Sequence, residues 1–82
     1  MREVIDVLLQ NIDKIKTTVL GAERIRRNLG IEGDAVSFCK ERILSADKIM
    51  RNGKNWYIYK DGIIITVNAS SFGIITAHCL NI

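Results

Sequence analysis

Residues 54–68 read KNWYIYKDGIIITVN, two short runs of aromatic and β-branched residues on either side of an Asp-Gly pair. Asp61-Gly62 indicates a two-residue hairpin turn, because both residues tolerate the positive φ that such a turn requires. We therefore expect antiparallel strands at 54–60 and 63–68, joined by this turn.

The turn register assigns the side chains of this hairpin to two faces, since successive residues of a strand point to opposite sides. Lys60 then faces Ile63, and Tyr57 faces Thr66. The predicted core face, which helices should cover, carries the apolar members Trp56, Ile58, Ile63, Ile65 and Val67. The predicted open face carries Asn55, Tyr57, Tyr59, Ile64, Thr66 and Asn68.

Two further strands extend the hairpin on either side. Lys48–Arg51 is a short strand, and the Asn52-Gly53 turn joins it to the hairpin because both turn residues tolerate positive φ. The fourth strand, at 74–80, follows a loop at 69–73.

The register of the last hairpin decides which side chains join the open face. With Asn68 opposite Ile74, both Thr76 and His78 lie on the open face, and Thr76 faces Thr66. A shift of the register by one residue would bury Thr76 and His78 instead.

Upstream of residue 45 the hydrophobic period is that of helices. Apolar residues from Val4 to Ile15 predict a helix from residue 2 to about 15. Thr17 or Thr18 can cap a second helix that ends near Gly30, and Asp34 can cap a third. The inward residues are Ala22, Ile25 and Leu29 in the second helix and Ala35, Val36, Cys39 and Ile43 in the third.

This order of elements predicts one α+β domain over residues 1–82. Its helical part spans about 2–44 and its sheet part about 46–81. We expect two to three N-terminal helices packed on one face of a four-stranded antiparallel β-meander. So short a chain buries only about 60–65% of its unfolded surface, so a partner or a second copy would add stability.

Composition and charge narrow the classes of function. Apolar residues make up 48% and charged residues 26%, which is typical of a globular protein, and a net charge of +3 permits binding to phosphate-bearing ligands. Acidic residues at the start argue against an export signal, and the uncharged stretch at 62–82 is interrupted as two strands around a loop require. We expect a cytoplasmic protein without a membrane segment, in which Cys39 and Cys79 are reduced and buried.

The sequence holds no pattern for a metal or a cofactor, and we expect neither. It has one His, no closely spaced Cys pair and no glycine-rich nucleotide loop. His78 and Cys79 are neighbours in a strand, so they point to opposite faces and do not form a catalytic pair.

Basic residues gather around the first hairpin and on the second helix. Cations beside exposed aromatic rings suit phosphate contacts combined with base stacking. The candidate ligand-binding residues are Arg51, Lys54, Asn55, Tyr59, Thr66, Asn68, Arg24 and Arg27. The alternative for either basic cluster is a solvated surface.

The candidate catalytic residues are His78, Thr76 and Tyr57. The imidazole would act as acid and base in RNA cleavage, where the 2′-hydroxyl attacks the phosphate and nearby cations stabilise the developing charge. The alternative for the single His is a structural hydrogen bond near the end of a strand.

Two stretches, Gly53–Tyr57 (GKNWY) and Ile74–His78 (IITAH), carry a resemblance to known proteins. Together with the second helix they resemble a small bacterial family of unknown function. That family has no established activity, so the resemblance assigns none to this chain. A looser resemblance, in topology and in the last strand, is to the fold of barnase, colicin ribonucleases and RelE-type toxins. It implies that the face with Thr66, Thr76 and His78 cleaves RNA.

These observations favour a small basic domain that binds RNA or a nucleotide on its open sheet face, with toxin-like ribonuclease activity as an extension. Replacing both Arg51 and Lys54 by alanine should then weaken binding. The alternative is a non-catalytic interaction or sequestering protein, such as a phage or mobile-element inhibitor of a host defence system, with a host protein as partner. The strand at 74–80 has no lysine or proline to protect an edge, so we also expect a homodimer.

Overall fold

The computed structural model describes residues 7–80 and contains one antiparallel sheet with strand order β1-β2-β3-β4. The strands are β1 (Lys48–Asn52), β2 (Asn55–Lys60), β3 (Ile63–Asn68) and β4 (Ile74–Cys79). They follow the 3₁₀ helix η1 (Ile12–Lys14) and the α-helices α2 (Val19–Leu29) and α3 (Ala35–Leu44). The expected α+β fold with a four-stranded meander is confirmed.

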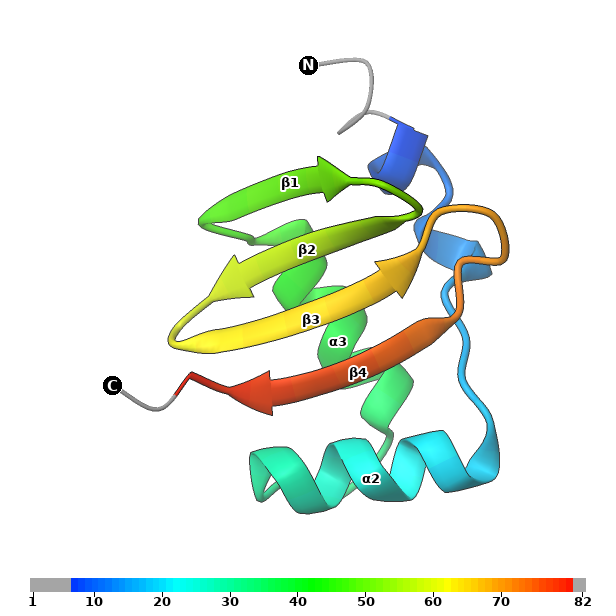
Figure 1. The fold of residues 1–82 in the computed structure, drawn as a ribbon. Helices are drawn as coiled ribbons and strands as arrows, with labels where there is room; N and C mark the ends of the chain where they lie inside the picture. The colour runs from blue at the N-terminus through cyan, green and yellow to red at the C-terminus, as the bar shows by residue number, and fades with distance from the viewer. Residues whose placement is uncertain (1–6, 81–82) are drawn as a thin grey trace.

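The helices lie on one side of the sheet and beside its last strand. Figure 1 shows α3 behind the sheet and α2 alongside β4. No helix within residues 7–80 lies on the other face of the sheet (Figure 1). The arrangement leaves an open sheet face, as the alternation of the strands predicts.

The two long helices begin at the predicted caps, and α2 also ends at the predicted Gly30. The Thr18 side chain accepts a hydrogen bond from the Gly21 amide at 2.9 Å, and Gly30 ends α2 in the left-handed conformation with φ 67°. At the start of α3, Asp34 accepts from the Val36 amide and the Ser37 hydroxyl. These two hydrogen bonds, the Ser37 hydroxyl first, lower the pKa of the Asp34 carboxyl because they favour its charged form.

The predicted first helix is wrong in its second half. Residues 7–10 are α-helical, but the helix ends at Gln10 and a 3₁₀ turn follows. The Asn11 side chain donates to the Val7 carbonyl at 2.7 Å and its amide donates to Leu8, three residues back. Asparagine competes for backbone groups in this way and so favours turns over helix interiors. The part predicted at residues 2–6 lies outside the described residues.

Both hairpin turns have two residues, but only one was placed correctly. Asp61 and Gly62 have φ values of 53° and 76°, as the predicted turn requires. In the first hairpin Asn52 pairs with Asn55, so the turn residues are Gly53-Lys54 rather than Asn52-Gly53. Only Gly53 has positive φ there, which is the pattern of a type II′ turn with glycine first.

The register of β2 and β3 is the predicted one, from Asn55 opposite Asn68 to Lys60 opposite Ile63. The register of β3 and β4 differs from the predicted one next to the loop that joins these two strands. Thr66 faces Thr76 as expected, but Val67 faces Ile74, so Ile75 is the extra residue of a β-bulge.

The bulge corrects the predicted position of Ile74. A pairing of Asn68 with Ile74 would have placed Ile74 on the open face, whereas its side chain is buried on the core face. Beyond the bulge the register recovers, so His78 faces Ile64 as predicted. The bulge thus buries one more isoleucine without removing Thr76 and His78 from the open face.

The core lies between the covered face of the sheet and the helices. Its largest fully buried side chains are Trp56, Leu8, Ile43, Ile58, Ile65, Val67 and Cys39. The predicted burial of Cys79 is wrong, because this residue lies at the end of β4 and is exposed. Burial raises the pKa of the Cys39 thiol to about 11.

None of the helices within residues 7–80 is both long enough and apolar enough to cross a membrane.

Candidate functional site

The open face is built from three rows of side chains that run across the sheet. The register places one amide row, one row with Tyr57 and one row with Tyr59. In order, the rows are Asn52–Asn55–Asn68, Met50–Tyr57–Thr66–Thr76 and Lys48–Tyr59–Ile64–His78. No carboxylate belongs to these rows, so the face is polar and aromatic with a basic side chain at one corner.

A shallow depression of about 220 Å³ lies on this face over β1, β2 and β3. Its lining residues are Met50, Asn52, Tyr57, Tyr59 and Ile64. Both tyrosines are half-buried, so their rings are held by their neighbours while one side stays accessible. They are two residues apart in β2, which spaces them by about 6.8 Å along the strand.

Three of the predicted ligand-binding residues on this face are buried or hydrogen-bonded within the protein, which limits how much of each side chain a ligand could reach. The Asn68 side-chain oxygen accepts from the amides of Ser70 and Ser71, so it organises the β3–β4 loop. Thr66 is only 6% exposed. The Asn55 amide group donates to the Tyr57 hydroxyl at 3.5 Å, and its own side-chain oxygen is buried without a partner among the described residues.

The predicted catalytic residues share the open face and lie on two of its strands. Thr76 and His78 are two residues apart on β4, whereas Tyr57 is two strands away on β2. Adjacent strands lie about 4.8 Å apart, so nearly 10 Å separates the backbones of Tyr57 and Thr76. Within residues 7–80, no hydrogen bond holds the His78 imidazole. Among the described residues, no hydrogen bond links the side chains of Tyr57, Thr76 and His78 to one another, and their catalytic role stays a prediction.

The basic residues of the first hairpin divide between the two faces. Arg51 faces Trp56 on the covered side, with its guanidinium 5.4 Å from the indole centroid and its Nε donating to Gly53. Lys60 also lies on that side and pairs with Asp47 at 3.6 Å. The structure therefore does not bring Arg51 to the open face.

Two lysines flank the tyrosine pair instead. The ammonium of Lys48 lies 6.0 Å from the centre of the Tyr59 ring, and Lys54 is exposed in the turn at the other end of the hairpin. Strand alternation is the signal that could have found this arrangement, because it places Lys48, Met50 and Asn52 on one face of β1 and Arg51 on the other. Met50 and Asn52 are the two lining residues that the sequence argument missed.

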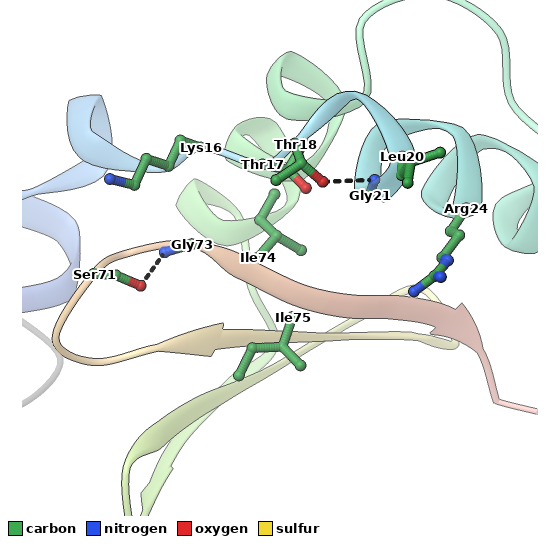
Figure 2. A pocket seen from close by; sticks show the side chains of 10 residues that line it. All are labelled: Lys16, Thr17, Thr18, Leu20, Gly21, Arg24, Ser71, Gly73, Ile74 and Ile75. Atoms are coloured by element: carbon green, nitrogen blue, oxygen red, sulfur yellow. Dashed lines mark hydrogen bonds between the residues drawn. The ribbon is translucent and has the colours of Figure 1, made fainter.

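The two predicted arginines of the second helix lie away from the open face, on α2. Arg27 is exposed, and Arg24 lines a separate groove between the start of α2 and β4. Figure 2 shows the Arg24 side chain reaching from the helix toward the strand.

No group of three or more His, Cys, Asp and Glu side chains that could hold a metal ion occurs in the part of the chain that the structure describes.

A comparison with protein families gives one match over most of the chain. A family model described as "Protein of unknown function (DUF3781)" matches residues 9–78. No curated protein and no solved structure matches the chain. The expected membership of an uncharacterised family is confirmed, whereas the looser likeness to ribonuclease toxins gains no support from these comparisons.

Proposed function

The chain belongs to the DUF3781 family, whose function is unknown, and from its open face we propose that it binds single-stranded RNA. The observation that carries this proposal is the depression beside two accessible tyrosines on a central strand, with a lysine at each end of the hairpin. Single-stranded nucleic acids bind where aromatic rings stack on bases and cations follow the phosphates.

Each open-face group has a role in such a complex. Tyr57 and Tyr59 stack on successive bases, because every base presents a flat π-surface. Lys48 and Lys54 contact phosphates on either side of the stacked bases, and Asn52 offers an amide to a base edge. The absence of a carboxylate from the three rows removes a source of repulsion for phosphate.

We propose binding without cleavage, in the cytoplasm, where RNA is available. His78 is the imidazole of the open face, and among the described residues no second acid or base stands beside it. Toxin-like ribonuclease activity is the outcome that would change this assignment. It would appear as cleavage of the bound RNA that His78→Ala abolishes.

Fluorescence polarisation with a labelled RNA of about ten nucleotides, a typical site size for such surfaces, tests the proposal. Tyr59→Leu should weaken binding by about 1–3 kcal/mol, the value for one stacked base, whereas Tyr59→Phe should keep it. Leucine keeps most of the apolar volume, so the comparison isolates stacking from packing.

The phosphate contacts are tested by two double variants with the same loss of charge. Lys48→Ala/Lys54→Ala should weaken binding and lower the slope of log K against log salt by about 1.4, since each contact with single-stranded nucleic acid contributes about 0.7. Arg24→Ala/Arg27→Ala is the control on α2. Equal effects of the two double variants, or no binding of RNA at low salt, would contradict the proposal.

The second candidate function is a non-catalytic interaction protein, for example a mobile-element inhibitor of a host system. This function is favoured by a groove between α2 and β4, which is lined by exposed aliphatic side chains and by two cationic ones. The side chains of that groove indicate what kind of partner it would bind.

A further inference from the structure

Two adjoining hollows run between α2 and β4, and neither shares a lining residue with the depression beside the two tyrosines. The larger has a volume of about 490 Å³ and lies at the start of the helix (Figure 2). The smaller, of about 210 Å³, continues along the helix toward Asn28 and Ala77. Both hollows are lined by Gly21, Arg24 and Ile75, so they form one α2–β4 groove.

Aliphatic side chains are exposed in and beside this groove. Leu20, on the first turn of α2, is 66% exposed, and Ile75, the bulge residue of β4, is 55% exposed. Both line the groove, and Val19, with 76% of its surface exposed, precedes Leu20. Large aliphatic side chains that gather on one surface are typical of interaction sites, whereas singly exposed ones are not.

The charged side chains that line the described groove are both cationic. Lys16 and Arg24 line the larger hollow, and Figure 2 shows their side chains at its opposite ends. No ion pair with another described residue engages either of them. The groove thus offers aliphatic contact in its middle and two positive charges that an acidic ligand would neutralise.

We propose that the α2–β4 groove binds an acidic segment of a partner protein, with an apolar side chain of the partner between Leu20 and Ile75. Carboxylates of the segment pair with Arg24 and Lys16. A protein segment fits better than a nucleic acid, because none of the side chains that line the two hollows is an aromatic ring on which a base could stack.

The backbone of β4 decides how such a segment is held. The Ile74 amide already donates to the Lys16 carbonyl at 2.8 Å, and Asn28 donates to the Ala77 carbonyl at 3.3 Å. These bonds occupy edge groups that an added β-strand would need. The segment therefore binds through side-chain contacts in the groove rather than as a fifth strand.

Amide chemical shifts of the isotope-labelled full chain, titrated with three synthetic peptides, test the proposal. The first peptide has two leucines flanked by aspartates, the second has lysines in place of the aspartates, and the third has serines in place of the leucines. The first should shift the amides of Leu20, Arg24 and Ile75, whereas the other two should bind at least about tenfold more weakly, since each lacks one of the two complementary features.

Three variants at exposed positions of α2 locate the effect. Arg24→Glu should weaken the first peptide about tenfold, and Arg24→Lys should retain most of its affinity. Arg27→Glu makes the same charge reversal on the same helix outside the groove, so it should change the affinity less than about threefold.

The proposal is overturned if the aspartate–leucine peptide shifts Tyr57 and Tyr59 rather than the groove, or shifts no amide at all. It is equally overturned if single-stranded RNA shifts the groove amides and displaces the peptide, which would assign the groove to nucleic acid. Because Tyr59→Leu and Arg24→Glu lie on different surfaces, loss of RNA binding and loss of peptide binding are separate results.

Discussion

Trp56 is buried on the covered face of the sheet, near the β1–β2 turn. Its side chain is 1% exposed, and the ring of Phe72 lies 5.4 Å from it, measured between centroids. The Arg51 guanidinium lies at the same distance on the β1 side. A single residue thus joins β2, β1 and the β3–β4 loop, and its predicted burial is confirmed.

Replacing Trp56 by alanine should destabilise the protein by about 3–5 kcal/mol, because a large cavity opens in the core. A domain of this size has a free energy of unfolding of only about 5–15 kcal/mol, so most of the stability would be lost. Denaturant unfolding followed by circular dichroism measures the effect, and Trp56→Phe, which keeps a ring in the cavity, is the milder control. An alanine variant as stable as the native protein would contradict the central role of this side chain.

At the scale of secondary structure, the turns determine how the strands meet. Asp61 and Gly62 both have positive φ, and this turn sets every pair from Lys60–Ile63 to Asn55–Asn68. A loop of two residues is too short to allow another register of the two strands. This one turn therefore determines which side chains of β2 and β3 lie on the open face.

Gly62→Ala should destabilise the protein by about 1–2 kcal/mol, the usual cost of left-handed backbone for a residue with a Cβ. A Cβ at this position would meet nothing within 4 Å, so the cost comes from the backbone alone at φ 76°. Gly62→Asn should cost less, since asparagine adopts this conformation more readily. Equal stabilities of the alanine and asparagine variants in denaturant unfolding would show that the backbone conformation of the turn is not the cause.

At the scale of the whole molecule, the chain presents two surfaces of different chemistry. The open face combines tyrosines, amides and lysines, whereas the α2–β4 groove combines aliphatic side chains with Lys16 and Arg24. Thr76 belongs to both surfaces, but the depression beside the tyrosines and the groove have no lining residue in common. This separation is what allows each proposed activity to be removed by its own variants.

The homodimer at micromolar concentration stays a prediction. β4 is an edge strand, but the Lys16 segment and Asn28 bond to it along much of its length. The Leu80 amide donates to the Gly62 carbonyl at 2.7 Å, so the exposed Cys79 marks the part of the edge that is left for pairing with a second copy. Sedimentation equilibrium should show a species of twice 9.3 kDa, which Cys79→Lys should dissociate because a lysine protects a strand edge.

Leu44→Lys introduces the same charge at an exposed site on α3 and is the matched control for this experiment. It should leave the dimer intact. A single 9.3 kDa species of the native protein across the micromolar range would contradict the prediction.

The sequence by itself determined the elements whose signals are local. The Asp61-Gly62 turn and the alternation on either side of it gave the β2–β3 register and the division into core and open faces, because both depend on residues close together in the chain. The caps at Thr18 and Asp34 were readable for the same reason, since each cap bonds within its own first turn. Strand alternation also places Arg51 on the covered face, opposite Trp56, and this signal too is local.

Only the tertiary structure decided the features that depend on distant residues. The parallel bridge between Lys16 and Gly73, and the bond from Asn28 to Ala77, bring α2 against β4 and create the groove. The bulge at Ile75 turns Ile74 into the core, which no local pattern required. The groove and the bulge are stabilised by the burial of apolar side chains and by hydrogen bonds to the edge of β4. These interactions form only when segments some fifty residues apart in the chain come into contact.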